Sequence, residues 1–269
     1  MTSDLLDGWP AGSSAMVFQL RDGIVESREE AGDLDKRRAW ASVSKLAVAL
    51  AFGVEHDWGL HDFNESVGPR GATIADLLSH SSGLGLEDGD PVSPIGTRRV
   101  YSNVGVDTAV AAVVGERDAA SWLDQRVFAP LGMVTTGLED RPASGVVGST
   151  RELATLAVAW LRPDGVAVAT RDRMIAPYRP DLDGVVPGFG RFTPCPWGLG
   201  PEVAGHKRHW MGDWPPESFG HFGQSGALAL MNARDQLGVV ATSTQPFGRW
   251  AADLWPRWTS AVRRRALDG

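Results

Sequence analysis

The stretch "WASVSKLAVALAF", residues 40–52, places a lysine at the edge of an apolar run. From Leu46 to Phe52 no side chain is polar, and so apolar a run is buried whether it forms a helix or a strand. Only three of the 26 basic residues are lysine, so lysine is not the default cation of this chain. A site that needs a nitrogen base can use Lys45 but not an arginine, which stays protonated in proteins. The alternative is a surface lysine with a packed stem and a solvated charge.

Ser42 lies three residues before Lys45, in the pattern S-x-x-K. We expect a helix over Ser42–Glu55 with Ser42 as its N-cap. Residues three apart share one face of a helix, so the hydroxyl and the amine can meet. Serine is a poor nucleophile until a base removes its proton, and a lysine near a helix N-terminus and away from water has a lowered pKa. The pattern therefore indicates a nucleophile and its base, although S-x-x-K alone is a weak signal.

Composition limits both the partners and the compartment. The chain has 269 residues, enough for one or two domains, and a formal net charge of −7. No basic patch runs through it apart from Arg263–Arg265, so nucleic acid is not an expected partner. The first residues lack the features of a signal peptide, and no run reaches the about 18 apolar residues of a membrane helix. We therefore expect a cytoplasmic protein with no membrane partner, in which Cys195, the single cysteine, forms no intramolecular disulfide.

Strand patterns lie at both ends of the chain, and helix patterns lie between them. Two strands are expected within residues 15–27 around the turn Asp22-Gly23, and two more at Ala227–Asn232 and Leu237–Thr244. Helices are expected at 73–78 and 149–161, each opened by a capping box, at 104–114, at 120–128, and in a C-terminal segment that Pro256 should kink or split. Residues 184–201 are too rich in Gly and Pro for regular structure.

This order of elements predicts an α+β fold. One antiparallel sheet would be built from both chain ends and flanked by the first and last helices, with a helical domain inserted. We place the α/β sandwich domain at residues 1–57 and 202–269, and the mainly helical domain at residues 58–201. A cleft between the two is the default position for a binding site.

The tripeptide Tyr101-Ser102-Asn103 carries side chains suited to catalysis. A tyrosine can shuttle a proton to a leaving group. Asn103 can hold either a substrate amide or the lysine. The alternative is a buried tyrosine whose hydroxyl caps the helix that follows.

The tripeptide His221-Phe222-Gly223 leads into the strand expected at 227–232. Glycine at a sheet edge lets a substrate approach the backbone closely. The N–H of Gln224 would then point at the substrate. Together with the N–H of Ser42 it would form an oxyanion hole.

These three segments, in this order, resemble the motifs of the serine β-lactamase and penicillin-binding protein superfamily. They are most similar to its class C-related branch, which holds class C β-lactamases, D-Ala-D-Ala carboxypeptidases and esterases. Further stretches similar to family segments are 72–84, 94–103, 127–133, 149–161 and 197–200. The resemblance implies an α/β sandwich with a helical domain, and a reaction through a serine acyl-enzyme without metal or other cofactor.

The resemblance also implies roles for single residues. The catalytic residues would be Ser42 as the acylated nucleophile, Lys45 as its base and Tyr101 as the proton shuttle. The substrate-binding residues would be Asn103, His221, Phe222, Gly223 and Gln224. Phe222 departs from the family, which usually has Thr or Ser there, with a hydroxyl that helps to bind the carboxylate of a penicillin. The stretch between Ser82 and Tyr101 is also short, so one side of the cleft should be open.

Three functions follow from this, with a small-molecule acyl substrate as the expected partner and the oligomeric state left open. The first is an esterase on small neutral esters. The second is a β-lactamase or D-Ala-D-Ala carboxypeptidase, which is disfavoured because peptidoglycan lies outside the cytoplasm. The third is a non-catalytic binding protein on the same fold, which is disfavoured because Ser42, Lys45, Tyr101 and His221 are all present together.

Overall fold

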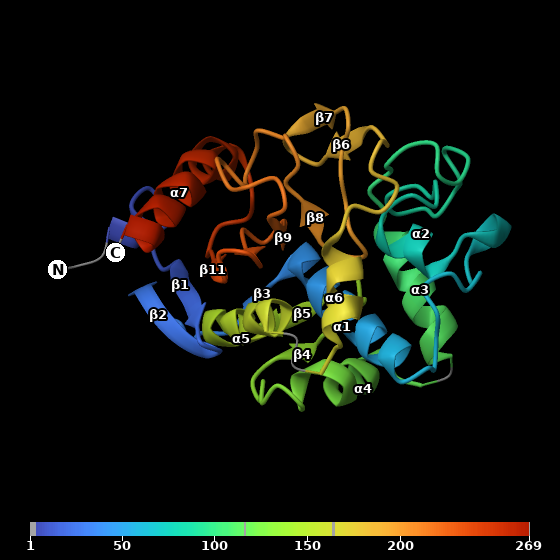
Figure 1. Cartoon of the computed structure of the whole chain (residues 1–269), viewed down its shortest axis with the longest axis horizontal. Helices are drawn as coiled ribbons and strands as arrows, with labels where there is room; N and C mark the ends of the chain where they lie inside the picture. The colour runs from blue at the N-terminus through green and yellow to red at the C-terminus, as the bar shows by residue number, and fades with distance from the viewer. Residues whose placement is uncertain (1–3, 116, 163–164, 269) are drawn as a thin grey trace.

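The computed structural model describes residues 4–115, 117–162 and 165–268 and centres on a six-stranded antiparallel sheet (Figure 1). From edge to edge the strands are β2 (Ile24–Ala31), β1 (Ser14–Arg21), β11 (Leu237–Thr242), β10 (Leu228–Asn232), β9 (Phe219–Phe222) and β8 (Glu202–Val203). β1 and β11 come from opposite ends of the chain and pair directly, from Ser14 with Thr242 to Gln19 with Leu237. The prediction of one antiparallel sheet built from both ends is confirmed.

The turn between β1 and β2 follows from its two residues. Asp22 has φ +51° and Gly23 has φ +76°, the pair of left-handed conformations that a type I′ hairpin turn requires. The predicted strands on either side of this turn are confirmed. β2 continues four residues beyond the predicted end, to Ala31.

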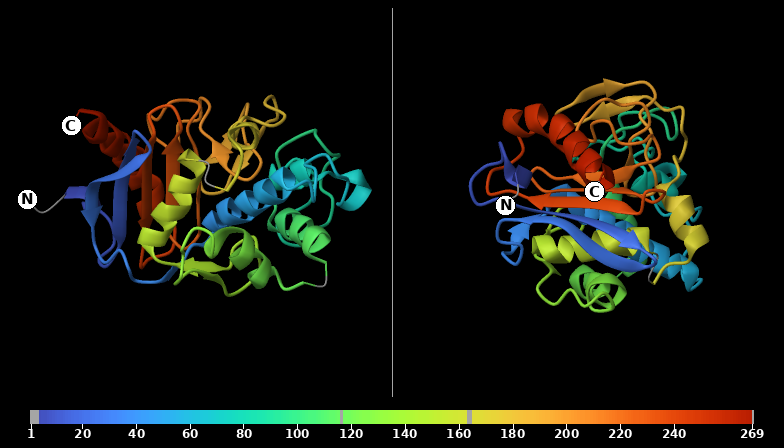
Figure 2. Two further views of the ribbon diagram at one scale, coloured as in Figure 1. Left: turned by 60° about the horizontal axis from the view of Figure 1, so that its bottom comes forward. Right: turned by 60° about the vertical axis from the view of Figure 1, so that its left-hand side comes forward.

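Alternation along β1 divides the core into two layers. Met16 and Phe18 belong to a cluster that includes helices α1 (Ser44–Asp57) and α5 (Thr150–Leu161), whereas Ala15 and Val17 belong to a cluster with helix α7 (Arg249–Asp268). Figure 2 shows α7 on one face of the sheet and α5 on the other. Side chains of a strand point alternately to its two faces, so a strand buried on both sides is apolar throughout.

Helix α1 starts later than the sequence suggested. Residues Ala41–Val43 form a 3₁₀ turn, η2, and the α-helix begins at Ser44. Its cap residue is Val43, which makes no side-chain capping bond, so the prediction that Ser42 is the N-cap is wrong. Because Ser42 lies inside the preceding turn, its hydroxyl is free to face Lys45 instead of the helix backbone.

Capping boxes were predicted at two helix starts, and one of them is complete. Thr73 and Asp76 cap each other's backbone N–H at the start of helix α2. Ser149 caps α5 through the N–H of Glu152, but the Glu152 carboxylate accepts hydrogen bonds from residues 135 and 136 instead of the cap backbone. The remaining helices are α2 (Ile74–Leu78), α3 (Asn103–Val114), α4 (Ala119–Leu123) with the π-helical turn η4 (Asp124–Phe128), α6 (Val168–Ile175), and the 3₁₀ turns η1 (Asp4–Leu6) and η3 (Pro69–Gly71).

One prediction drawn from Gly and Pro was wrong, and one of the two alternatives expected at Pro256 is excluded. The segment 184–201 contains a short hairpin of β6 (Gly184–Val186) and β7 (Gly190–Phe192), with Gly188 at φ +81° in the turn between them. Helix α7 runs through Pro256 without splitting into two. One face of α7, with Trp255 and Trp258, is buried in the core, and this packing outweighs the hydrogen bond that proline removes.

Helix α5 lies against the large sheet, where it contacts β1, β10 and β11. Residues 58–201, which include α5, were predicted from the sequence to form the helical domain. The division into two domains stays a prediction, and its boundaries would have to place α5 in the sandwich domain. A small sheet of β3 (Arg38–Ala39), β5 (Val146–Gly148) and β4 (Gly137–Leu138) joins the two parts. Within the described residues, no helix has the length and hydropathy to cross a membrane.

Candidate active site

Ser42 sits in the 3₁₀ turn before α1, and strand β5 holds that turn. The backbone N–H of Trp40 donates to Val146 O at 2.9 Å, and its indole N–H donates to Gly148 O at 3.2 Å. Ala41 has φ +46°, a left-handed conformation that costs a non-glycine residue on the order of 1 kcal/mol. Such a residue persists only where its surroundings fix it, and here the buried Trp40 and β5 do so.

The amine of Lys45 is surrounded by three oxygen atoms. Its Nζ lies 2.7 Å from Asn103 Oδ1, 2.9 Å from Ala143 O and 3.3 Å from Ser42 Oγ. The two carbonyl oxygens can only accept hydrogen bonds. A neutral amine therefore gives both of its hydrogens to them and directs its lone pair at the Ser42 hydroxyl. In this arrangement Asn103 holds the lysine, one of the two roles expected for it.

Burial makes the neutral amine available near pH 7. Lys45 is 1% exposed, and this desolvation lowers its pKa from 10.5 to about 7. Asp107 and Glu87 act in the opposite direction, while Arg141 adds to the lowering. The lysine at the edge of the apolar run is thus a buried group and not a surface cation.

Tyr101 lies between Ser42 and a wall of aromatic rings. Its ring centroid is 4.9 Å from Lys45 Nζ and 5.9 Å from the centroids of Trp197 and His221. Burial raises the pKa of Tyr101, and a hydrogen bond with Ser42 lowers it by less. The phenol is therefore neutral, so it can pass a proton but does not act as a phenolate base.

His80 fixes the backbone on both sides of Tyr101. Its carbonyl accepts the N–H of Val100 at 2.8 Å, and its Nδ1 accepts the N–H of Ser102 at 3.2 Å. Its ring stacks on Tyr101 with centroids 4.5 Å apart. Burial, followed by the nearby Lys45, lowers the pKa of His80 well below 6.5, so the ring stays neutral.

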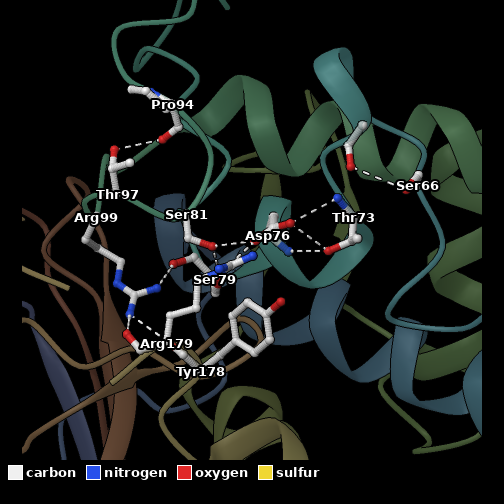
Figure 3. A network of polar contacts seen from close by, with 11 residues as sticks. Ser66, Thr73, Asp76, Ser79, Ser81, Pro94, Thr97, Arg99, Tyr178 and Arg179 are labelled. Carbon is white, nitrogen blue, oxygen red and sulfur yellow. Dashed lines mark hydrogen bonds and ion pairs between the residues drawn. The ribbon is translucent and has the colours of Figure 1, made fainter. Parts of the chain in front are cut away.

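A buried polar network anchors the chain just before Tyr101 (Figure 3). Arg99 donates to the carbonyl oxygens of Ser79, Tyr178, Arg179 and Cys195 at 2.7–3.2 Å. Asp76, at the start of α2, accepts from Ser81 Oγ and from Arg179 Nε, both at 2.9 Å. The single cysteine therefore helps to hold this segment through its carbonyl oxygen, and its thiol is buried.

His221 faces the site as a neutral hydrogen-bond acceptor. Burial and the nearby Lys45 lower its pKa to about 3. Its Nδ1 lies 2.7 Å from Phe222 O, which only accepts, so Nδ1 carries the proton. Its Nε2 is then an acceptor, and it has no partner among the described residues. The ring cannot act as a cation for a substrate carboxylate.

Gly223 is where the end of β9 meets the turn that carries Ser42. A Cβ at this position would lie 2.2 Å from Trp40 O and 3.1 Å from Ser42 N. The glycine therefore permits contact with the turn, whereas we had expected it to permit contact with a substrate. Neither Ser42 N–H nor Gln224 N–H has an acceptor among the described residues, as an oxyanion hole requires.

Phe222 contributes less to the site than the sequence suggested. Its side chain lies on the α7 side of the sheet, in an aromatic cluster with Phe189, Trp210, Phe247 and Trp255, and it is 6% exposed. Because side chains alternate along β9, His221 faces the site and Phe222 faces mainly the opposite layer. The ring is therefore mainly part of the hydrophobic core, and it also lines the pocket described below.

A pocket of about 240 Å³ opens at Ser42. Its lining residues are Ser42, Leu86, Glu87, Tyr101, Asn103, Pro187, Trp197, His221, Phe222 and Gln224. Glu87, Leu86 and Pro187 were missed because they lie in loops with no periodic or motif signal. Trp197 lies in the stretch 197–200, which is similar to a family segment, but the sequence indicated no role for it. In the described parts of the chain, no cluster of three His, Cys, Asp or Glu side chains is placed to hold a metal ion.

Comparison with known proteins identifies the family of this chain. The family model described as Beta-lactamase matches residues 23–262. The chain belongs to the β-lactamase family. A β-lactamase from Mycobacterium bovis, known from its crystal structure, is 35% identical, with 98% of both chains covered and a TM-score of 0.92. The resemblance to the serine β-lactamase and penicillin-binding protein superfamily is therefore confirmed.

More distant structures share the fold. A family VIII carboxylesterase is 18% identical over 97% of this chain and 94% of its own, with a TM-score of 0.77. A β-lactamase/D-alanine carboxypeptidase from Yersinia pestis is 17% identical over 99% and 98%, with a TM-score of 0.72. No match to a curated protein was found.

Proposed function

We propose that this member of the β-lactamase family is a serine hydrolase that forms an acyl-enzyme at Ser42 and acts on small neutral esters. Neutral Lys45 takes the Ser42 proton as Oγ attacks the ester carbonyl. The N–H groups of Ser42 and Gln224 hold the negative oxygen that forms. Lys45 then returns the proton through the Tyr101 hydroxyl to the departing alkoxide, which leaves as an alcohol. A water molecule, deprotonated by the same amine, then attacks the acyl carbonyl; the bond to Ser42 Oγ breaks, the amine returns the proton to Oγ, and the acid is released.

The charge at the pocket supports a neutral substrate. Among the described residues of the lining, Glu87 is the only one with a formal charge at pH 7, and its carboxylate is paired with Arg141. His221 is neutral and presents an acceptor nitrogen, so it cannot hold a carboxylate. Hydrogen bonds to a charged group contribute about 1.5–3 kcal/mol each, which an anionic substrate would forgo here. This absence of a cation in the described lining is the observation that carries the proposal.

The test compares one neutral and one anionic substrate. We expect kcat/KM for p-nitrophenyl butyrate to exceed that for nitrocefin by more than about tenfold, or about 1.4 kcal/mol of barrier. A fluorophosphonate should label the peptide that contains Ser42, and Ser42→Ala should abolish labelling and turnover. Ser225→Ala, at the serine that follows Gln224 in the stretch "GQSGA" (residues 223–227), serves as the matched control and should keep both.

A β-lactamase is the second candidate, favoured by the 35% identity with the Mycobacterium bovis protein. Faster turnover of nitrocefin than of the neutral ester would establish it and reject the esterase proposal. Labelling at Ser225 or Cys195 instead of Ser42 would reject both candidates.

A further inference from the structure

A closed ring of hydrogen bonds surrounds the amine of Lys45. Asn103, which accepts from Lys45, donates through its Nδ2 to Glu87 Oε1 at 2.5 Å. Glu87 is paired with Arg141, and Arg141 Nε donates to Asp107 Oδ2 at 2.5 Å. Asp107 Oδ1 accepts from the backbone N–H of Ala143 at 2.8 Å. Ala143 O accepts from Lys45 Nζ at 2.9 Å, which closes the ring.

Two side chains of this ring, those of Asp107 and Arg141, neither line the pocket nor contact Ser42. Asp107 lies one turn after Asn103 on α3, so both side chains lie on the same face of that helix. Arg141 lies in the loop between β4 and β5, in the segment that supplies Ala143 O. The ion pair between Asp107 and Arg141 thus links that loop to α3, and these two segments supply the two carbonyl acceptors of Lys45.

We propose that Asp107 and Arg141 are positioning residues that hold Ala143 O and Asn103 Oδ1 against Lys45 and so aim its lone pair at Ser42. If either carbonyl moved away, the amine could turn a hydrogen toward Ser42, and the hydroxyl would lose its proton acceptor. The inference rests on the proposed nucleophile and base. It is independent of whether the substrate is an ester or a β-lactam.

The charges around Lys45 predict how the pH dependence of the reaction should change in each variant. The titratable and charged groups that face it are Asp107 on α3, Arg141 and Glu87 on loops, Tyr101, His80, and His221 on β9. Burial holds the pKa of His221 at about 3 and that of His80 well below 6.5, and it raises the pKa of Tyr101, so these three groups favour their neutral forms around pH 7. The acid limb of the reaction therefore reports Lys45. Asp107 favours its ammonium form and Arg141 disfavours it.

The experiment measures the rate of fluorophosphonate labelling of Ser42 from pH 5 to 9 in the full-length protein. Asp107→Asn removes the anion, so its acid limb should move to lower pH, by about half a unit or more. Arg141→Gln removes the cation, so its limb should move to higher pH. Both variants should also lose at least about tenfold in plateau rate, because the lone pair is no longer aimed.

Asp235→Asn is the matched control. It breaks the ion pair with Arg263 on α7. The side chains of Asp235 and Arg263 are 19% and 25% exposed, similar to the 22% and 34% of Asp107 and Arg141. Its limb and plateau should match the unmodified protein.

Two results would overturn the inference: limbs that coincide in all four proteins, or plateau losses no larger than that of Asp235→Asn. If Asp107→Asn fails to fold, the direction of the shift in Arg141→Gln decides alone. An unmodified protein that is not labelled at Ser42 would instead reject the proposed function, and this inference with it.

Discussion

Lys45 shows how a single residue can be defined by its surroundings. An exposed lysine would be protonated at pH 7, and burial in an apolar run brings its pKa to about 7. Arginine in the same place would keep its charge and could not accept a proton. The scarcity of lysine in this chain therefore marks a position where a titratable cation is needed.

We expect Lys45→Arg to lower kcat by at least about 10², the low end of what general-base catalysis contributes. Steady-state kinetics with the neutral ester at pH 8 measure this, and Lys36→Arg, at an exposed lysine, is the control. If the Lys45→Arg variant kept more than about a tenth of the activity, under about 1.4 kcal/mol of barrier, Lys45 would be an electrostatic or structural group.

At the scale of elements, the site is made where β9 and the turn η2 touch. The contact is so close that a Cβ at position 223 would lie 2.2 Å from Trp40 O and 3.1 Å from Ser42 N. The oxyanion hole that we propose needs both elements, because one N–H comes from η2 and the other from the residue after Gly223.

Gly223→Ala should separate the two elements. Its Cβ would lie 2.2 Å from a backbone oxygen, so either the strand end or the turn must shift. Loss of one oxyanion-hole donor costs about 10²–10³ in kcat, and we expect a decrease of that order. Gly137→Ala, where a Cβ meets nothing within 4 Å, should leave kcat unchanged. Equal kinetics for the two variants would contradict this account.

The aromatic cluster between β9 and α7 carries a second prediction. Phe222→Thr should lower the free energy of unfolding by about 3–5 kcal/mol, as for truncation of a buried Phe, because the ring is packed on several sides. Urea unfolding measures it. For the same reason we do not expect the variant to gain activity on nitrocefin. A Phe222→Thr variant that stayed stable and hydrolysed nitrocefin faster would contradict this account. It would show that position 222 acts on the substrate and not through packing.

At the scale of the whole molecule, a buried charge cluster joins the sheet edge to the loop before β9. Glu202 on β8 accepts from Lys207 Nζ and His209 Nε2, both at 2.6 Å, and from Trp210 Nε1 at 2.8 Å. Burial raises the pKa of Glu202, but the two basic side chains outweigh this and hold it well below 4.5. The carboxylate therefore stays charged and fixes this loop, for which the sequence suggested no role.

We expect Glu202→Gln to lower the free energy of unfolding at pH 7 by about 3 kcal/mol or more, since it leaves a buried cation without its partner. Because the folded pKa of Glu202 lies below the unfolded one, its contribution is complete above about pH 4.5 and declines as the pH falls further. The difference between the two proteins should therefore stay constant from pH 6 to about 4.5 and shrink as the pH falls from there to 3.

Urea unfolding across that range is the measurement. Glu29→Gln removes a partly exposed partner of Arg265 and should cost under about 1 kcal/mol. A Glu202→Gln loss as small as this control, or one that does not change with pH, would refute the prediction.

The sequence by itself determined the strands at the two chain ends, the helices between them, and the identity of Ser42, Lys45 and Tyr101 as residues to examine. It could do so because hydrophobic period, turn chemistry and residue scarcity are local properties. The hairpin turn at Asp22 and the capping box at Thr73 needed nothing beyond their neighbours in the chain.

Only the tertiary structure decided how those residues act. The acceptors of Lys45 come from positions 103 and 143, and the close contact of Gly223 is with residue 40. Glu87 and Asp107, from separate segments, both bind Arg141. The face of β9 that carries Phe222 likewise depends on the register of the sheet. Burial, and with it every pKa shift at this site, is set by contacts between residues distant in sequence, which no local pattern contains.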